Sequence, residues 1–84
     1  MSMSFKYKIM FEPSVNNIFK LINYFTTFNC SVYLSKNDED RHVNGKSLLG
    51  IRSLDLHTYD TITLYFDEDV NIKDVKSKLD LIEI

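Results

Sequence analysis

Near its middle, the 84-residue chain has the sequence VNGKSLLGIRSL from residue 43 to residue 54. Residues 41–45 predict a short strand of low hydrophobicity, which we expect at an edge of a sheet. Ser47 is a favoured helix N-cap, and the apolar residues Leu48, Leu49, Ile51 and Leu54 follow it. The stretch therefore predicts a strand, a tight connection and a short helix.

The residues that precede this stretch predict a strand, a helix and a second strand. Residues 5–11 alternate between apolar and polar, which indicates a half-buried strand. Pro13 ends that strand, and Ser14 can cap a helix of about 14 residues. The apolar residues of this helix recur at spacings of three and four. They are Val15, Ile18, Phe19, Ile22 and Phe25. Residues 30–35 alternate again, and we expect Phe19, Phe25 and Phe28 in the core.

The residues that follow predict one more strand and a last helix. Residues 61–66 alternate, with Ile62, Leu64 and Phe66 on one face. Asp69 or Asn71 can cap a final helix, whose apolar stripe is Val75, Leu79 and Ile82. The order β-α-β-β-α-β-α predicts an α+β two-layer sandwich within a single domain, residues 1–84. Its antiparallel four-stranded sheet would carry three helices on one face.

Composition excludes several classes of function. Ten Lys and Arg residues against twelve Asp and Glu give a net charge of -2, which argues against direct nucleic-acid binding. The single cysteine, Cys30, excludes an internal disulfide and a cysteine-based zinc site, and we expect it to be a buried apolar residue. With two scattered histidines, we expect neither metal nor cofactor. No apolar run approaches the roughly 18 residues of a membrane span, so we expect a cytoplasmic protein.

The central stretch resembles that of HPr, the phosphocarrier of the bacterial sugar phosphotransferase system. In that family a strand ends in Lys-Ser, followed by two apolar residues, Gly, an apolar residue, any residue, and Ser-Leu. Residues 46–54 keep this pattern, and the resemblance extends back to residues 28–32 and forward to residues 60–64. The resemblance implies the same fold, the open-faced βαββαβα sandwich.

The resemblance fails where the family carries phosphate. HPr proteins have a histidine at the start of the first helix, followed after one residue by Arg and Pro. Here the matching positions are Ser14, Asn16 and Asn17. A serine hydroxyl without a base does not act as a reversible phosphoryl carrier, and we expect His42 in the edge strand and His57 in a connection. We therefore predict no catalytic residue and no enzyme activity. Ser14 is then a helix cap, or part of a residual anion-binding spot.

Ser47 is the candidate regulatory site. In the HPr proteins of low-GC Gram-positive bacteria, the matching serine is phosphorylated by an ATP-dependent HPr kinase, and the product binds a catabolite-control transcription factor. The resemblance therefore implies regulatory phosphorylation of Ser47 and a partner-binding patch. The residues of that patch are Leu48, Leu49, Ile51 and Arg52. The alternative is that Ser47 only caps its helix.

Three functions remain open. The first is a regulatory HPr paralogue that acts through protein contacts. The second is a phosphocarrier of sugar transport that uses an unexpected residue. The third is an interaction or small-ligand module that has reused the fold, including a homodimer formed through the unpaired edge of the third strand.

Overall fold

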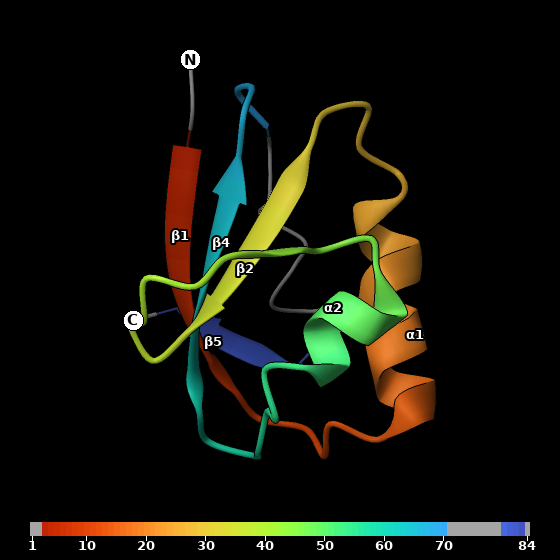
Figure 1. Ribbon diagram of the computed structural model, residues 1–84, viewed down its shortest axis with the longest axis vertical. Coiled ribbons are helices and arrows are strands. Elements are labelled where there is room, and N and C mark those ends of the chain that lie inside the picture. Colours follow the sequence, from red (N-terminus) through yellow and green to blue (C-terminus); the bar gives the residue numbers. More distant parts are fainter. Residues whose placement is uncertain (1–2, 71–79, 84) are drawn as a thin grey trace.

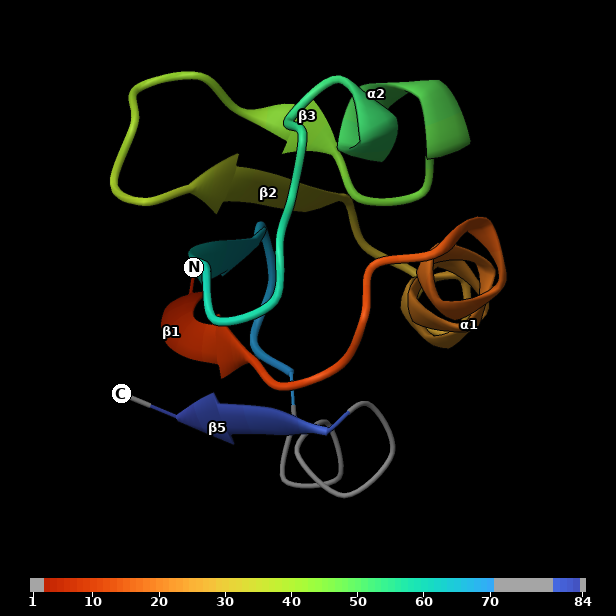
Figure 2. The ribbon, with the colours of Figure 1, turned by 90° about the horizontal axis from the view of Figure 1, so that it is seen from below.

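The structure is a computed structural model that describes residues 3–70 and 80–83. Its elements are β1 (Met3–Ile9), α1 (Val15–Phe25), β2 (Val32–Lys36), β3 (Val43–Asn44), α2 (Leu48–Arg52), β4 (Thr61–Phe66) and β5 (Leu81–Glu83). The strands form one antiparallel sheet in the order β3-β2-β4-β1-β5. Both helices lie on the same face of that sheet (Figures 1 and 2). The predicted two-layer α+β fold is confirmed.

Strand β4 occupies the centre of the sheet. It has the bounds that the sequence predicts, and Ile62, Leu64 and Phe66 are fully buried on its helix-facing side. Leu64 lies opposite Phe5 of β1 and Leu34 of β2, so one apolar row crosses three strands. Cross-strand apolar pairs of this kind stabilise a sheet. The core therefore lies between these strands and the helices.

Helix α1 covers this core. Because β4 separates β1 from β2, the α1 connection must cross the sheet on one face. Its buried residues are Ile18, Leu21, Ile22 and Phe25. The prediction that Phe19 belongs to the core is wrong, since its side chain is 45% exposed, and Val15 is 42% exposed. The buried stripe is centred on Leu21 and Phe25, which places Val15 and Phe19 at its edge. Cys30 and Phe25 are buried and Phe28 is partly buried, as expected.

Three hydrogen bonds near Gly45 join the end of β3 to β2 and to the residues that precede β2. The Gly45 amide donates to the carbonyl of Val32 at 2.7 Å. Lys46 Nζ donates to the carbonyls of Phe28 and Cys30, both at 2.9 Å. β3 is shorter than the predicted strand over residues 41–45, because Arg41 turns toward α2 and donates to the carbonyl and the Oγ of Ser53. These bonds fix α2 against the end of the sheet.

The other face of the sheet is partly covered by the β2–β3 connection. Figure 2 shows this connection extending away from the side that carries the helices. Asp38 in the connection forms a 2.7 Å ion pair with Lys6 of β1. The His42 ring packs edge-on against Tyr65 with centroids 4.6 Å apart. Ser35, whose Oγ donates to the Tyr65 hydroxyl at 3.5 Å, is fully buried. The β2–β3 connection therefore shields part of the sheet face that lies opposite the helices.

The carboxyl end of the chain adds a fifth strand. β5 pairs with Tyr7–Ile9 of β1, so the sheet has five strands where four were predicted. The prediction that Ile82 belongs to a helix is wrong, because Ile82 lies opposite Lys8 in β5. The free edge of β1 supplies the backbone partners that an extended segment requires. Most of the predicted last helix, including Val75 and Leu79, lies outside the described residues.

Gly45→Ala is expected to destabilise the fold. An added Cβ would lie 3.0 Å from Val32 Cγ1 and 3.1 Å from Phe25 Cδ2, both in the core. Overpacking of this kind costs about 1–3 kcal/mol, which chemical denaturation measures as a lower midpoint. Gly50→Ala is the matched control, because its Cβ meets nothing closer than 3.4 Å and a helix favours alanine. Equal stability of the two variants would contradict this account of Gly45.

Candidate functional site

The start of α1 is a capped helix terminus. Ser14 has extended backbone angles, and its Oγ accepts a hydrogen bond from the Asn17 amide at 3.3 Å. The Glu12 carbonyl accepts from the Ser14 amide and from Asn17 Nδ2, both at 2.8 Å. The predicted cap at Ser14 is confirmed. Asn17 is thereby tied to the preceding turn, while Asn16 remains exposed.

The start of α2 is capped in the same way. Ser47 Oγ accepts from the Gly50 amide at 3.1 Å, and the Ser47 amide donates to the Asn44 carbonyl at 3.1 Å. The predicted cap at Ser47 is therefore confirmed. The Ser47 side chain is half-buried, and the ammonium of its neighbour Lys46 is bound to two carbonyls. A group added to Ser47 would have to release the Gly50 amide or share it.

The predicted partner patch on α2 is smaller than expected. Leu49 is 80% exposed, Arg52 is exposed and Leu48 is half-buried. The prediction that Ile51 belongs to an exposed patch is wrong, because its side chain is fully buried in the core. A short helix packed on a sheet must bury one side, and Ile51 lies on that side. Leu49 and Arg52 are three residues apart and share the outer side of α2.

Neither histidine lies at a helix start. His57 Nδ1 is 3.7 Å from Asp60 Oδ2, and its Nε2 is 3.9 Å from Asp55 Oδ1. Two carboxylates at this range would repel a phosphoryl group on either nitrogen. His42 precedes β3 and packs against Tyr65 on the sheet face away from the helices. The surroundings of His57 are therefore acidic, and those of His42 are aromatic.

Hydrogen bonds and an ion pair fix the connection that contains His57, between α2 and β4. Lys36 Nζ donates to the Asp55 carbonyl at 2.8 Å and lies 3.6 Å from Asp60 Oδ2. Tyr59 adopts a left-handed backbone with φ of 74°, and its amide donates to the Ile9 carbonyl at 2.7 Å. These contacts place residues 55–56 beside the start of α1.

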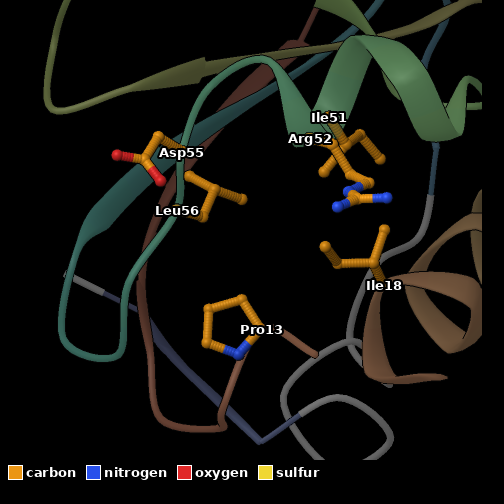
Figure 3. Close-up of a pocket in the computed structure, with 6 residues that line it drawn as sticks. All are labelled: Pro13, Ile18, Ile51, Arg52, Asp55 and Leu56. Carbon is orange, nitrogen blue, oxygen red and sulfur yellow. The ribbon is translucent and has the colours of Figure 1, made fainter. Parts of the chain in front are cut away.

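A pocket lies between the start of α1, the end of α2 and residues 55–56 (Figure 3). Its volume is about 200 Å³. The six residues that line it are Pro13, Ile18, Ile51, Arg52, Asp55 and Leu56. Of these, only Ile51 and Arg52 were predicted to belong to a functional surface. Sequence reasoning missed the rest, because three segments distant in sequence supply the lining.

Other kinds of site find no support in the described part of the chain. Residues 3–70 and 80–83 contain no cluster of three or more His, Cys, Asp or Glu side chains able to hold a metal ion. Over the same residues, no helix is both long and apolar enough to cross a membrane.

The architecture is that of the phosphocarrier proteins called HPr. A phosphocarrier protein HPr from Bacillus anthracis str. Ames matches with a TM-score of 0.75 at 16% identity, covering 94% of each chain. HPr-C-His from Thermoanaerobacter tengcongensis matches with a TM-score of 0.70 at 18% identity, over 95% of this chain and 88% of that one. The histidine-containing phosphocarrier protein of a Mycoplasma matches with a TM-score of 0.66 at 16% identity, over 93% and 84%.

The sequence itself establishes the family. Residues 16–82 match the family described as the PTS HPr component phosphorylation site. The chain therefore belongs to the HPr family of the phosphotransferase system. No curated protein sequence matches the chain.

Ser14→Ala is expected to lower the free energy of unfolding by about 1 kcal/mol, because the Asn17 amide loses its acceptor. Urea denaturation measures this change. Asn16→Ala is the matched control at an exposed position of the same helix, where no cap is lost. If both variants unfold at the same urea concentration, the capping role of Ser14 is excluded.

Proposed function

We propose that this HPr-family protein is a regulatory paralogue that acts through protein contacts and does not carry phosphate on histidine. The observation that carries the proposal is that a serine hydroxyl, bound to the Asn17 amide, occupies the N-cap of α1. The HPr resemblance implies a histidine at this position. A phosphoryl carrier needs a nucleophile whose phosphate is both accepted and released readily, and an unactivated hydroxyl meets neither condition.

The surroundings of Ser14 support this proposal. The Ser14 hydroxyl accepts from the Asn17 amide, and an amide is not a base able to take the hydroxyl proton. Asn16 supplies no charge to balance a phosphoryl group, where the family resemblance implies arginine. The two histidines lie elsewhere, one between carboxylates and one against an aromatic ring.

Ser47 is the proposed point of regulation. Phosphorylation adds a charge of roughly −1.5 to −2 and three strong acceptor oxygens. The Ser47 hydroxyl accepts a hydrogen bond from the Gly50 amide, so a phosphate on Ser47 would have one backbone donor nearby. Leu49, 80% exposed, follows on the same short helix. A partner that reads both features would meet a charge beside an apolar contact, which is a combination with high specificity.

Arg52 gives the proposed partner surface a second charge. It lies at the carboxyl end of α2, while Ser47 lies at the amino end. Phosphorylated Ser47 and Arg52 would thus present opposite charges on either side of Leu49. We infer that the partner carries an apolar side chain flanked by a basic and an acidic group. An HPr kinase and a transcription regulator are the proposed partner classes.

Intact-mass measurement with two phosphate donors tests the proposal. With ATP and an HPr kinase, we expect one added phosphate on the native protein. Ser47→Ala should abolish it, because the acceptor hydroxyl is lost. Ser53→Ala is the matched control, since Ser53 lies at the other end of α2 and its Oγ is also in hydrogen bonds. Loss of phosphate in the Ser53 variant alone would refute the assignment to Ser47.

The second donor, phosphoenolpyruvate with the general phosphotransferase enzyme, tests for carrier chemistry. We expect no phosphate on the native protein and acceptance by the double variant Ser14→His, Asn16→Arg, which restores the residues implied by the family. Asn16→Arg alone is the control and should accept none. Phosphate on the native protein would show that it is a carrier. A double variant that folds but accepts none would show that the likeness at Ser14 is superficial.

A further inference from the structure

Tyr59 has a backbone conformation that its own side chain disfavours. Five non-glycine residues among those described have positive φ, and four of them are Asn or Asp, whose short side chains tolerate this region. Tyr59 is the exception, at a φ of 74°. A bulky residue held in this region indicates a role for its side chain in function.

The Tyr59 side chain has no partner in the part of the chain that the structure describes. Tyr59 is 66% exposed. Among the described residues, its ring belongs to no aromatic pair and its hydroxyl forms no hydrogen bond. The amide of Tyr59, in contrast, donates to the Ile9 carbonyl at 2.7 Å. The fold therefore fixes the backbone at this position and leaves the phenol free to contact another molecule.

A second exposed apolar side chain lies next to Tyr59. Met10 directly follows Ile9, the hydrogen-bond partner of Tyr59, and is 38% exposed. Thr58 Oγ also donates to the Phe11 carbonyl at 3.2 Å, so the turn after β1 lies beside the turn before β4 (Figure 1). Tyrosine and methionine are both enriched at protein interfaces.

Carboxylates lie close to this pair of side chains. Glu12, two residues after Met10, is exposed. Asp80 is exposed as well, and its carbonyl accepts the Met10 amide at 3.1 Å. Asp60 directly follows Tyr59 and supplies a third carboxylate. We refer to residues 10–12, 58–60 and 80 as the Tyr59 surface.

The Tyr59 surface has a negative charge. It contains three carboxylates and neither Lys nor Arg. Lys36 Nζ lies 3.6 Å from Asp60 Oδ2 and balances that carboxylate. Lys8, on the neighbouring end of β1, balances a second one at most. An excess of negative charge beside a free aromatic ring is complementary to an arginine, which pairs with carboxylates and stacks on tyrosine.

We propose that the Tyr59 surface binds a basic protein segment in which an arginine lies beside an apolar side chain. The guanidinium stacks on the Tyr59 ring and pairs with an adjacent carboxylate, while the apolar side chain contacts Met10. This surface is formed by the turns at the ends of β1 and β4, whereas Ser47 and Leu49 belong to α2. The proposal therefore does not rest on the regulatory role of Ser47.

NMR titration of the isotope-labelled full chain with the end-blocked pentapeptide Gly-Arg-Leu-Arg-Gly tests the surface. We expect the largest amide shifts at Met10, Tyr59 and Asp60. The pentapeptide Gly-Lys-Leu-Lys-Gly keeps the charge and should bind at least about twofold more weakly, because an ammonium group lacks the planar face of a guanidinium. The pentapeptide Gly-Glu-Leu-Glu-Gly should not bind, because the carboxylates repel it.

Variants of the full chain separate the ring from the charge. Tyr59→Gly should weaken binding of the arginine peptide at least about fivefold, since it removes the aromatic anchor and glycine adopts a positive φ readily. Tyr33→Ser is the matched control, because Tyr33 is also exposed, at 43%, but lies in β2. Glu12→Gln should weaken binding about twofold and reduce its dependence on salt.

Several outcomes would overturn the proposal. They are equal binding of the arginine and glutamate peptides, undiminished binding by Tyr59→Gly, and shifts confined to α2. Shifts of the same amides with protein concentration alone would assign the surface to a second copy of the chain instead. Ser47→Ala should bind the arginine peptide as the native chain does, so this test is independent of phosphorylation.

Discussion

The insertion of β4 between β1 and β2 is the constraint on which the rest of the structure depends. With β4 in the centre, the chain that joins β1 to β2 must pass over the sheet, and α1 is that passage. Three fully buried residues of β4 belong to the same core cluster as the buried residues of α1. The same arrangement brings the start of α1 next to α2, since α2 follows the edge strand β3. The strand order therefore determines that the start of α1 and the helix α2, which carry the candidate functional residues, lie side by side.

Short-range contacts then fix the two helix starts. Ser14 caps α1 and Ser47 caps α2. Each hydroxyl accepts a hydrogen bond from the backbone amide three residues further along the chain. Lys46 and Arg41 add side-chain bonds that join α2 to segments distant in sequence. Both helix starts are thus set by hydrogen bonds to the backbone. A phosphate placed on either serine would compete with the hydrogen bond that caps the helix.

Local patterns in the sequence predict the elements well and their surroundings less well. The bounds of β4 and the caps at Ser14 and Ser47 follow from alternation and capping preference, which are properties of neighbouring residues. Ile51 and Phe19 were placed wrongly, one on the surface and one in the core, because periodicity does not define how wide a buried stripe is. Ile82 was assigned to a helix, although the edge of β1 captures it in β5. The pocket was missed, since Pro13, Arg52 and Leu56 meet only through the tertiary fold.

The left-handed backbone of Tyr59 means that the residue type at this position lowers the stability of the fold. A bulky residue at a φ of 74° carries a steric penalty that glycine would avoid, of order 1–3 kcal/mol. Tyr59 is 66% exposed, so burial offsets little of that penalty. The amide bond to Ile9 belongs to the backbone and any residue with an amide hydrogen keeps it. The tyrosine therefore lowers the free energy of unfolding relative to glycine at this position, and the chain is less stable than its own backbone permits.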